Sequence, residues 1–112
     1  NLHATASMLN DLSEAKAVHR VFRNPPPCAG IKGLLGHTLG AAGAVETVIS
    51  LLALDNGFLP GNRGLRQVDP LCALPIVAEP DPNRRPRLIL SNAFGFGGNN
   101  ASVLLEASRW SA

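Results

Sequence analysis

The stretch that most restricts how this chain can fold is residues 39–54, which is apolar on nearly every side. A helix of that composition is normally buried all round in a folded protein. Asn56 and Gly57 follow it and are typical of a helix end. The run is shorter than the roughly 20 residues of a membrane span, and Glu46 interrupts it. We therefore expect a core helix and no membrane span.

The composition of the whole chain indicates more apolar surface than the chain can bury by itself. Of 112 residues, 46% are apolar and only 16% are charged, which is hydrophobic for one small domain. A partner could cover the surplus, or the rest of a larger domain could, and we favour the second interpretation. The net charge of +2 argues against a nucleic-acid or anionic-membrane partner. The basic residues Arg84, Arg85 and Arg87 stand among prolines and predict a solvated loop.

The remaining segments predict a second helix and several short strands. Apolar spacing predicts the helix over 11–22, with Asp11 and Glu14 as a capping box and three prolines after its end. The predicted strands are residues 28–31, 74–78, 88–91 and 101–106. Glycines within 95–98 predict a tight turn before the last strand. This order predicts an α/β fold in which the helices pack on one mixed sheet.

The cysteines give no sign of a metal site or a disulfide. Cys28 and Cys72 form no Cys-x-x-Cys pair and have no histidine at metal-ligand spacing. We expect reduced core cysteines in a cytoplasmic protein. The opening Asn-Leu-His also lacks the basic and apolar regions of a signal peptide, which agrees with that compartment.

Two histidines are candidates for chemistry, although a lone histidine more often serves packing. His37 follows Gly36 and precedes the predicted core helix, whose N-terminal dipole disfavours an imidazolium. The neutral ring can donate one N–H to a developing negative charge, as an enolate or a thioester oxyanion requires. His3 is the second candidate. His19 has no comparable surroundings in the sequence, and we expect it at the surface.

Lys32 and Glu46 are the only charged residues between positions 29 and 54. A buried lysine or glutamate without a partner costs several kcal/mol. We therefore predict that the two form an ion pair, which would fix the turn containing His37 relative to the core helix. This role is structural.

The glycine-rich segment 95–98 superficially resembles a dinucleotide-binding fingerprint. That motif requires a following helix and an acidic residue about 20 positions later. Only a predicted strand and the end of the sequence follow here, so we reject this interpretation. The turn instead offers backbone N–H groups at close range, with Phe94 and Phe96 beside an apolar site.

Three motifs cover the chain from end to end. They are Leu2-His3-Ala4-Thr5-Ala6-Ser7 with Asn10, Asp11, Glu14 and Ala15; Lys32 with Gly36-His37, Gly40, Ala41, Ala42 and Gly43; and residues 92–101. Together, and in this order, they resemble the C-terminal half of β-ketoacyl synthases of the two-histidine, elongating type. Thiolases differ by a second cysteine in the glycine-rich loop, and the CoA-primed initiating synthases differ by an asparagine at the position of His37.

The resemblance implies a thiolase-like layered fold built, in the whole enzyme, from two similar halves. It also implies a decarboxylative Claisen condensation in fatty-acid or polyketide synthesis. A growing acyl group sits on a cysteine, malonyl-carrier protein loses carbon dioxide, and the resulting carbanion attacks the acyl thioester. No cofactor of the enzyme itself is implied, because the substrates ride on the phosphopantetheine of the acyl carrier protein.

The resemblance also assigns roles to individual residues. His3 and His37 would be catalytic and would donate N–H groups to the malonyl thioester oxygen, with Lys32 and Glu46 as their supporting pair. Phe96, with Phe94, would gate the acyl pocket and contribute to the oxyanion hole. Thr5 and Ser7 would bind the pantetheine arm. The acidic carrier protein could meet Arg63, Arg66 and Arg84.

Some positions depart from the family's usual pattern. Ala4 stands where glycine is usual, Ala6 where serine is frequent, and Gly30-Ile31 where a Ser-Thr pair precedes the lysine. The nucleophilic cysteine is also missing, because it lies in the family's N-terminal half and no acyl-enzyme forms without it. We interpret residues 1–112 as a C-terminal synthase segment whose partner is the missing N-terminal half, within a parent homodimer or heterodimer.

Two alternatives remain open at this point. A non-catalytic subunit of the chain-length-factor type would shape a partner's pocket without performing the condensation. An independent small α/β binding module would be a cooperatively folding monomer.

Overall fold

The structure is a computed structural model that describes residues 1–108. The elements in the described range are α1 Met8–Val21, α2 Lys32–Leu35, the 3-10 turn η1 Leu39–Ala41, α3 Ala42–Asn56, β1 Leu88–Phe94, the 3-10 turn η2 Phe96–Gly98 and β2 Asn100–Glu106. Helices pack on a small sheet, so the predicted α/β class is confirmed.

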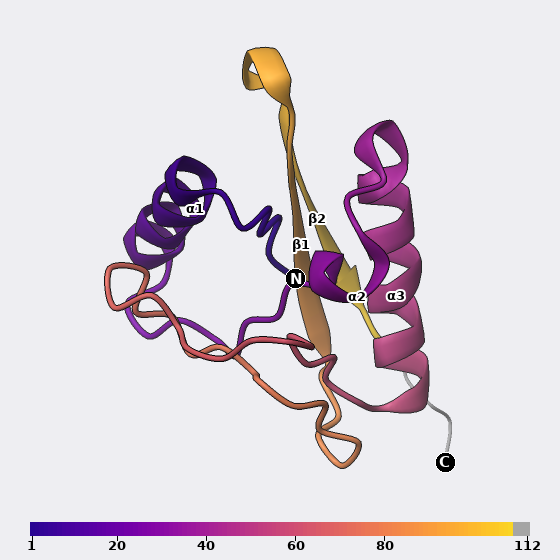
Figure 1. Cartoon of the computed structure of the whole chain (residues 1–112). Helices are drawn as coiled ribbons and strands as arrows, with labels where there is room; N and C mark the ends of the chain where they lie inside the picture. The colour runs from indigo at the N-terminus through magenta and orange to yellow at the C-terminus, as the bar shows by residue number, and fades with distance from the viewer. Residues whose placement is uncertain (109–112) are drawn as a thin grey trace.

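The sheet is an antiparallel hairpin of β1 and β2, whose register pairs Leu88 with Glu106 and Phe94 with Asn100. Within residues 1–108 the sheet is therefore antiparallel rather than mixed, which corrects that part of the prediction. Gly97 within η2 has a φ of 78°, which glycine adopts without strain, and the predicted tight turn is confirmed. Figure 1 shows the hairpin standing between α1 and α3, with η2 at its far end. α3 packs on both strands.

The first residues of the chain run between β1 and the segment at 28–31. The terminal amine of Asn1 donates to the carbonyl of Leu90 (2.7 Å), and the amide of Asn92 donates to the carbonyl of Asn1 (3.1 Å). On the other side, the amide of Leu2 donates to the carbonyl of Ala29 (2.8 Å). These bonds place the next residue, a histidine, in the middle of the molecule.

The predicted strands at 28–31 and 74–78 are absent from the structure, which corrects that prediction. The two segments meet in a single parallel bridge between Cys28 and Ile76. Pro75 has no N–H to extend a ladder. The carbonyl of Val77 accepts instead from both the side chain (2.7 Å) and the backbone amide (2.9 Å) of Asn62. Asn62 thus takes the place that a neighbouring strand would occupy.

Helix α1 begins earlier than the sequence predicted, at Met8 with Ser7 as its N-cap residue. The predicted capping box of Asp11 and Glu14 is therefore wrong. Glu14 lies within the helix, is buried, and points at the N-terminal segment rather than back along its own helix. The spacing of Asp11 and Glu14 matches a capping box, but the helix begins before both residues.

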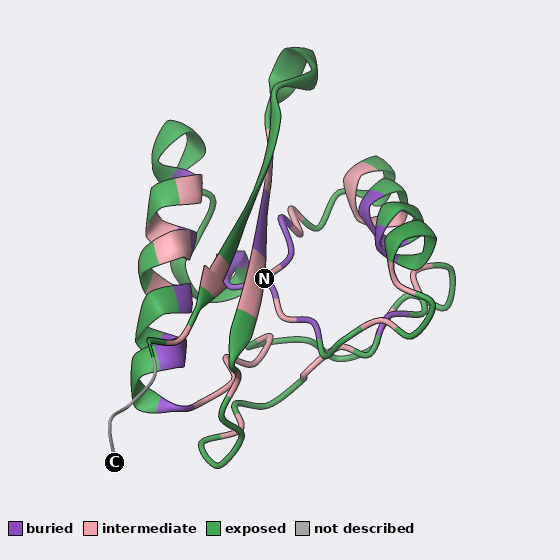
Figure 2. Cartoon of the chain, turned by 180° about the vertical axis from the view of Figure 1, so that it is seen from behind, coloured by how far each residue is buried: buried purple, intermediate pink, exposed green. Residues whose placement is uncertain are grey.

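Helix α3 is covered on one face only, which corrects the prediction that it is buried all round. Its buried face consists of Ala42, Glu46, Ser50, Ala53 and Leu54. Large apolar residues face outward instead, including Leu52, which is 45% exposed. Figure 2 shows this outer face as exposed along much of the helix. The helix ends as predicted, at Gly57, which has a left-handed φ of 69° and caps the carbonyl of Ala53.

The segment Leu39–Asn56 is long and apolar enough, by length and composition alone, to cross a membrane, with a mean hydropathy of 1.2 over 18 residues. A core helix of a folded domain meets the same criterion. The charged residue on its buried face has a partner outside the helix, because Glu46 forms an ion pair with Lys32. We interpret it as a core helix.

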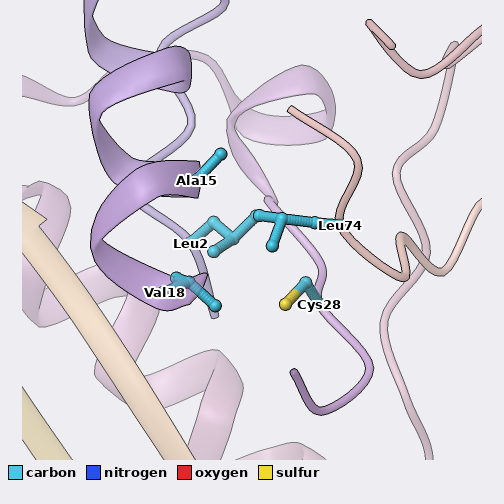
Figure 3. Packing of buried hydrophobic residues seen from close by; sticks show 5 residues of the cluster. All are labelled: Leu2, Ala15, Val18, Cys28 and Leu74. Carbon is cyan, nitrogen blue, oxygen red and sulfur yellow. The ribbon is translucent and has the colours of Figure 1, made fainter. Parts of the chain in front are cut away.

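A small apolar cluster connects α1 to the loops beside it. Figure 3 shows its members converging from four separate segments: Leu2, Ala15, Val18, Cys28 and Leu74. Their side chains are small or medium in size, so this core alone buries little apolar surface. It does, however, fix α1 against the segment that carries His3.

Candidate active site

His3 and His37 lie next to each other although 34 positions separate them in the sequence. Their ring centroids are 5.6 Å apart, and the rings meet edge to face at 86°. His3 is buried, with 5% of its surface exposed, whereas His37 is exposed. Phe94, at the end of β1, completes the cluster, with its ring 5.5 Å from that of His3.

The backbone on both sides of the His3 ring is held by charged groups. The amides of His3 and Ala4 donate to the two carboxylate oxygens of Glu14, at 2.9 and 3.0 Å. The carbonyl of His3 accepts a hydrogen bond from the ammonium of Lys32. The Glu14 carboxylate and the Lys32 ammonium thus bind the same short segment, which restricts movement of the His3 backbone and so of its ring.

Both imidazoles are held in the tautomer that carries its proton on Nε2. The amide of Leu39 donates to Nδ1 of His37 (3.1 Å), and an amide can only donate. The ammonium of Lys32 lies 3.3 Å from Nδ1 of His3 and can likewise only donate. Each Nδ1 therefore offers its lone pair, and each ring keeps one N–H, on Nε2, for another acceptor.

His3 is kept neutral by its surroundings. Burial is the main cause that lowers the pKa of His3 below its ordinary value, and the positive charge of Lys32 lowers it further. Glu14 and Glu46 oppose this shift without reversing it. A neutral ring agrees with the tautomer, because a protonated Nδ1 would face the Lys32 ammonium.

This shift makes the stability of the fold depend on pH. We expect stability to fall as the pH drops through the ordinary imidazole pKa of about 6.5, because the unfolded chain then takes up the proton before folded His3 does. The His3→Gln variant lacks this titration. Thermal unfolding midpoints from about pH 8 to about pH 5 should therefore fall more steeply in the parent protein than in the variant. Equal slopes would contradict the assignment.

Lys32 and Glu46 form a buried ion pair beside the His3 ring. Only 7% and 2% of their side chains are exposed, so neither charge has bulk water to solvate it. The second carboxylate oxygen of Glu46 accepts from the side chain of Asn1 (3.3 Å), which also donates to the Ser91 hydroxyl (3.0 Å). The pair thus connects α2 and α3 to the His3 segment and to β1.

The other residues singled out by the sequence lie at the edge of this cluster or away from it. Phe96 sits on η2 at the far end of the hairpin and is 97% exposed, so the structure does not bring it to the histidines. Thr5 and Ser7 lie between His3 and α1, where their hydroxyls form a hydrogen bond with each other (2.9 Å). The Ser7 side chain makes no cap bond to α1.

Glu14 and Asn92 are the site residues whose contacts the sequence did not reveal. Besides the two backbone amides, Glu14 accepts from the side chain of Asn92 (3.1 Å). The Oδ1 of Asn92 accepts in turn from the hydroxyl of Ser102 on β2 (2.8 Å). The sequence did contain one indication. The helical spacing of the apolar residues places Glu14 on the inward face of the helix, where a carboxylate without a partner is costly.

The arrangement brings together two imidazole N–H donors, a buried ion pair and an aromatic ring. Donors held in this way stabilise negative charge on an oxygen that develops between them. Residues 1–66 match the family described as beta-ketoacyl synthase, C-terminal domain, and the chain belongs to the β-ketoacyl synthase family.

Individual relatives give the same result. The chain is 40% identical over 105 residues to the 3-oxoacyl-[acyl-carrier-protein] synthase 2 of Mycobacterium leprae, a match that covers 92% of this chain and 25% of that protein. It is 37% identical over 108 residues to the synthase 1 of Escherichia coli K12, covering 95% and 26%. The chain thus spans about a quarter of the length of the curated relatives that it matches.

Solved structures show the same fold. The ishigamide ketosynthase/chain length factor superposes with a TM-score of 0.90 at 34% identity, covering 96% of this chain and 27% of that one. A beta-ketoacyl synthase from Burkholderia phymatum gives 0.89 at 32% identity, covering 97% and 27%. The thiolase-like layered fold implied by the sequence resemblance is confirmed.

Proposed function

We propose that this chain supplies the two-histidine half of the active site of a β-ketoacyl-[acyl-carrier-protein] synthase. The observation that carries the proposal is the edge-to-face contact of His3 and His37, each with its remaining N–H on Nε2. With the ring centroids 5.6 Å apart, an oxygen atom beside the two rings would accept from both Nε2–H groups at ordinary hydrogen-bond lengths, provided that the two groups converge on it. By the resemblance to the β-ketoacyl synthases, that acceptor would be the malonyl thioester oxygen.

The reaction would proceed in two steps. The bond between the malonyl carboxylate and its α-carbon breaks, carbon dioxide leaves, and the electron pair moves onto the thioester oxygen as an enolate held by His3 and His37. The α-carbon of the enolate then attacks the acyl thioester on a cysteine supplied by the rest of the synthase, and the cysteine leaves as a thiolate. Neither step requires the histidines to give up a proton.

The residues at the rim would serve binding. Thr5 and Ser7 carry exposed or half-buried hydroxyls beside His3 and would bind the phosphopantetheine arm of the carrier protein. Phe96 would gate the acyl pocket and contribute its backbone N–H to the oxyanion hole. Its almost complete exposure on the hairpin tip leaves that ring free to contact the remainder of the enzyme.

The apolar outer surfaces would be covered by the N-terminal half of the synthase. On α3, the residues Val48, Leu51 and Leu52 are 43–55% exposed, and on β2 Leu104 is 64% exposed. Contiguous exposed apolar surface of this kind marks an interaction site. The surface argues against an independent binding module. The assembled parent would be a homodimer or a heterodimer of synthase chains, acting in the cytoplasm.

The test is an assay of malonyl-carrier-protein decarboxylation and of condensation, using the synthase completed by its other half. Decarboxylation together with condensation is the expected result. A completed protein that forms a stable complex but performs neither reaction would overturn the catalytic proposal. It would favour instead a subunit of the chain-length-factor type, since one of the structural relatives is a ketosynthase/chain length factor.

A matched variant separates the contributions of the two halves. Replacing the nucleophilic cysteine of the other half by alanine should abolish condensation, because no acyl-enzyme forms. Decarboxylation should persist, because it needs only the two histidine donors of this chain. Loss of both reactions would show that this chain does not itself hold the malonyl group.

A further inference from the structure

Two positions that depart from the family pattern, Ala4 and Gly30, are in contact. A Cβ built on Gly30 would lie 2.7 Å from the Cβ of Ala4, closer than real side-chain carbons approach one another. It would also lie 3.4 Å from Oδ1 of Asn62. The space between the two backbones therefore holds one methyl group, and Ala4 provides it.

Neither segment can easily move aside for a second methyl. The amide of Gly30 donates to Oδ1 of Asn62 (2.7 Å), and the preceding carbonyl of Ala29 accepts from Leu2 (2.8 Å). On the facing segment, the amide of Ala4 is held by Glu14 (3.0 Å). A side chain at position 30 would consequently press on the peptide that joins His3 to Ala4.

The methyl on Ala4 carries a conformational cost of its own. Ala4 has a φ of 38°, in the left-handed region that favours glycine. The opposite arrangement, with glycine at position 4 and the methyl at position 30, would fill the same space without that strain. Only the combination with a side chain at both positions forces the two segments apart.

We propose that Ala4 and Gly30 form a coupled positioning pair, in which the absence of a side chain at position 30 lets Ala4 hold the His3 backbone in register with His37. The pair acts through His3 and touches no reacting atom. This inference rests on the proposed function for its catalytic readout, but its packing readout is independent of any activity.

The experiment is a double-variant cycle in the completed synthase, comparing Ala4→Gly, Gly30→Ala and the two together. Gly30→Ala alone should lower the thermal unfolding midpoint by several degrees, because overpacking strains a closely packed site. It should also lower kcat for malonyl decarboxylation about tenfold or more through misplacement of His3, with KM for malonyl-carrier protein little changed. Ala4→Gly in the same chain should restore both quantities.

A matched control adds the same methyl where there is room. A Cβ on Gly43 would lie 3.6 Å from the Cβ of Ala93, an ordinary contact, so Gly43→Ala should not lower the unfolding midpoint. If Gly30→Ala unfolds the protein outright, recovery of folding in the double variant supports the pair. A double variant no better than Gly30→Ala, or a Gly30→Ala protein equal to the parent, overturns it.

The cycle keeps this inference separate from the proposed function. If the parent protein shows no decarboxylation, the catalytic proposal fails, and the unfolding midpoints still decide whether the two positions are coupled. If the parent is active and the midpoints of the two single changes simply add, the pair is overturned and the catalytic proposal stands.

Discussion

Replacing His3 or His37 by alanine should reduce malonyl-carrier-protein decarboxylation by the completed synthase about 10²–10³-fold in each case. On the proposed mechanism each change would remove one N–H donor to the enolate oxygen, and the two rings would be equivalent in that respect. The rate of carbon dioxide release at saturating malonyl-carrier protein measures the effect. An unchanged rate in either variant would remove that residue from the mechanism.

The double variant provides a sharper criterion. If both rings donate to one oxygen, the loss in the His3→Ala/His37→Ala protein should be smaller than the product of the single losses, because residues that act as a unit are not additive. His19→Ala is the matched control, since that imidazole is exposed on α1, away from the ring cluster. It should leave the rate unchanged.

The second large effect is expected from Lys32→Met. Removing the ammonium leaves Glu46 as a buried carboxylate without its ion-pair partner, which typically costs about 3–5 kcal/mol of unfolding free energy. The Nδ1 of His3 also loses the donor that fixes its tautomer. Denaturant unfolding measures the first effect, and decarboxylation by the folded fraction measures the second.

A paired variant separates these two effects. In Lys32→Met/Glu46→Gln no charge is left buried at this position, so most of the lost stability should return while the His3 ring still lacks its donor. Stability should therefore recover without activity. Full activity in this variant would make the pair scaffold only, as the sequence alone suggested. Lys16→Met, on the exposed face of α1, is the control for loss of a lysine and should change neither quantity.

Features that depend on one local environment could be predicted from the sequence. Lys32 and Glu46 stand alone as charges in a long apolar stretch, so their pairing follows from the cost of burying either one. Gly57 marks the end of α3 because few other residues adopt its left-handed φ. The hairpin was predicted for a similar reason, since the glycines between β1 and β2 permit little except a turn.

The family resemblance assigned His3 and His37 to one site although they are distant in sequence. Other features that depend on such distant contacts were not predicted. Glu14 has the spacing of a helix cap, and only the arrival of the His3 segment at α1 gives its carboxylate a different use. The short strands failed because Asn62 occupies the carbonyl of Val77. The apolar composition of α3 predicted burial on every side. In this chain only the face toward the sheet is covered, so the prediction was wrong.

The Glu14 carboxylate has a consequence for how the site comes into being. It accepts hydrogen bonds from the His3 segment and from Asn92 on β1 while belonging to α1, so one side chain joins three parts of the chain. We therefore expect the His3 segment and β1 to reach their positions only when α1 is docked. A substitution on α1 that weakens this docking should lower the fraction of correctly folded molecules, while each folded molecule reacts at the normal rate.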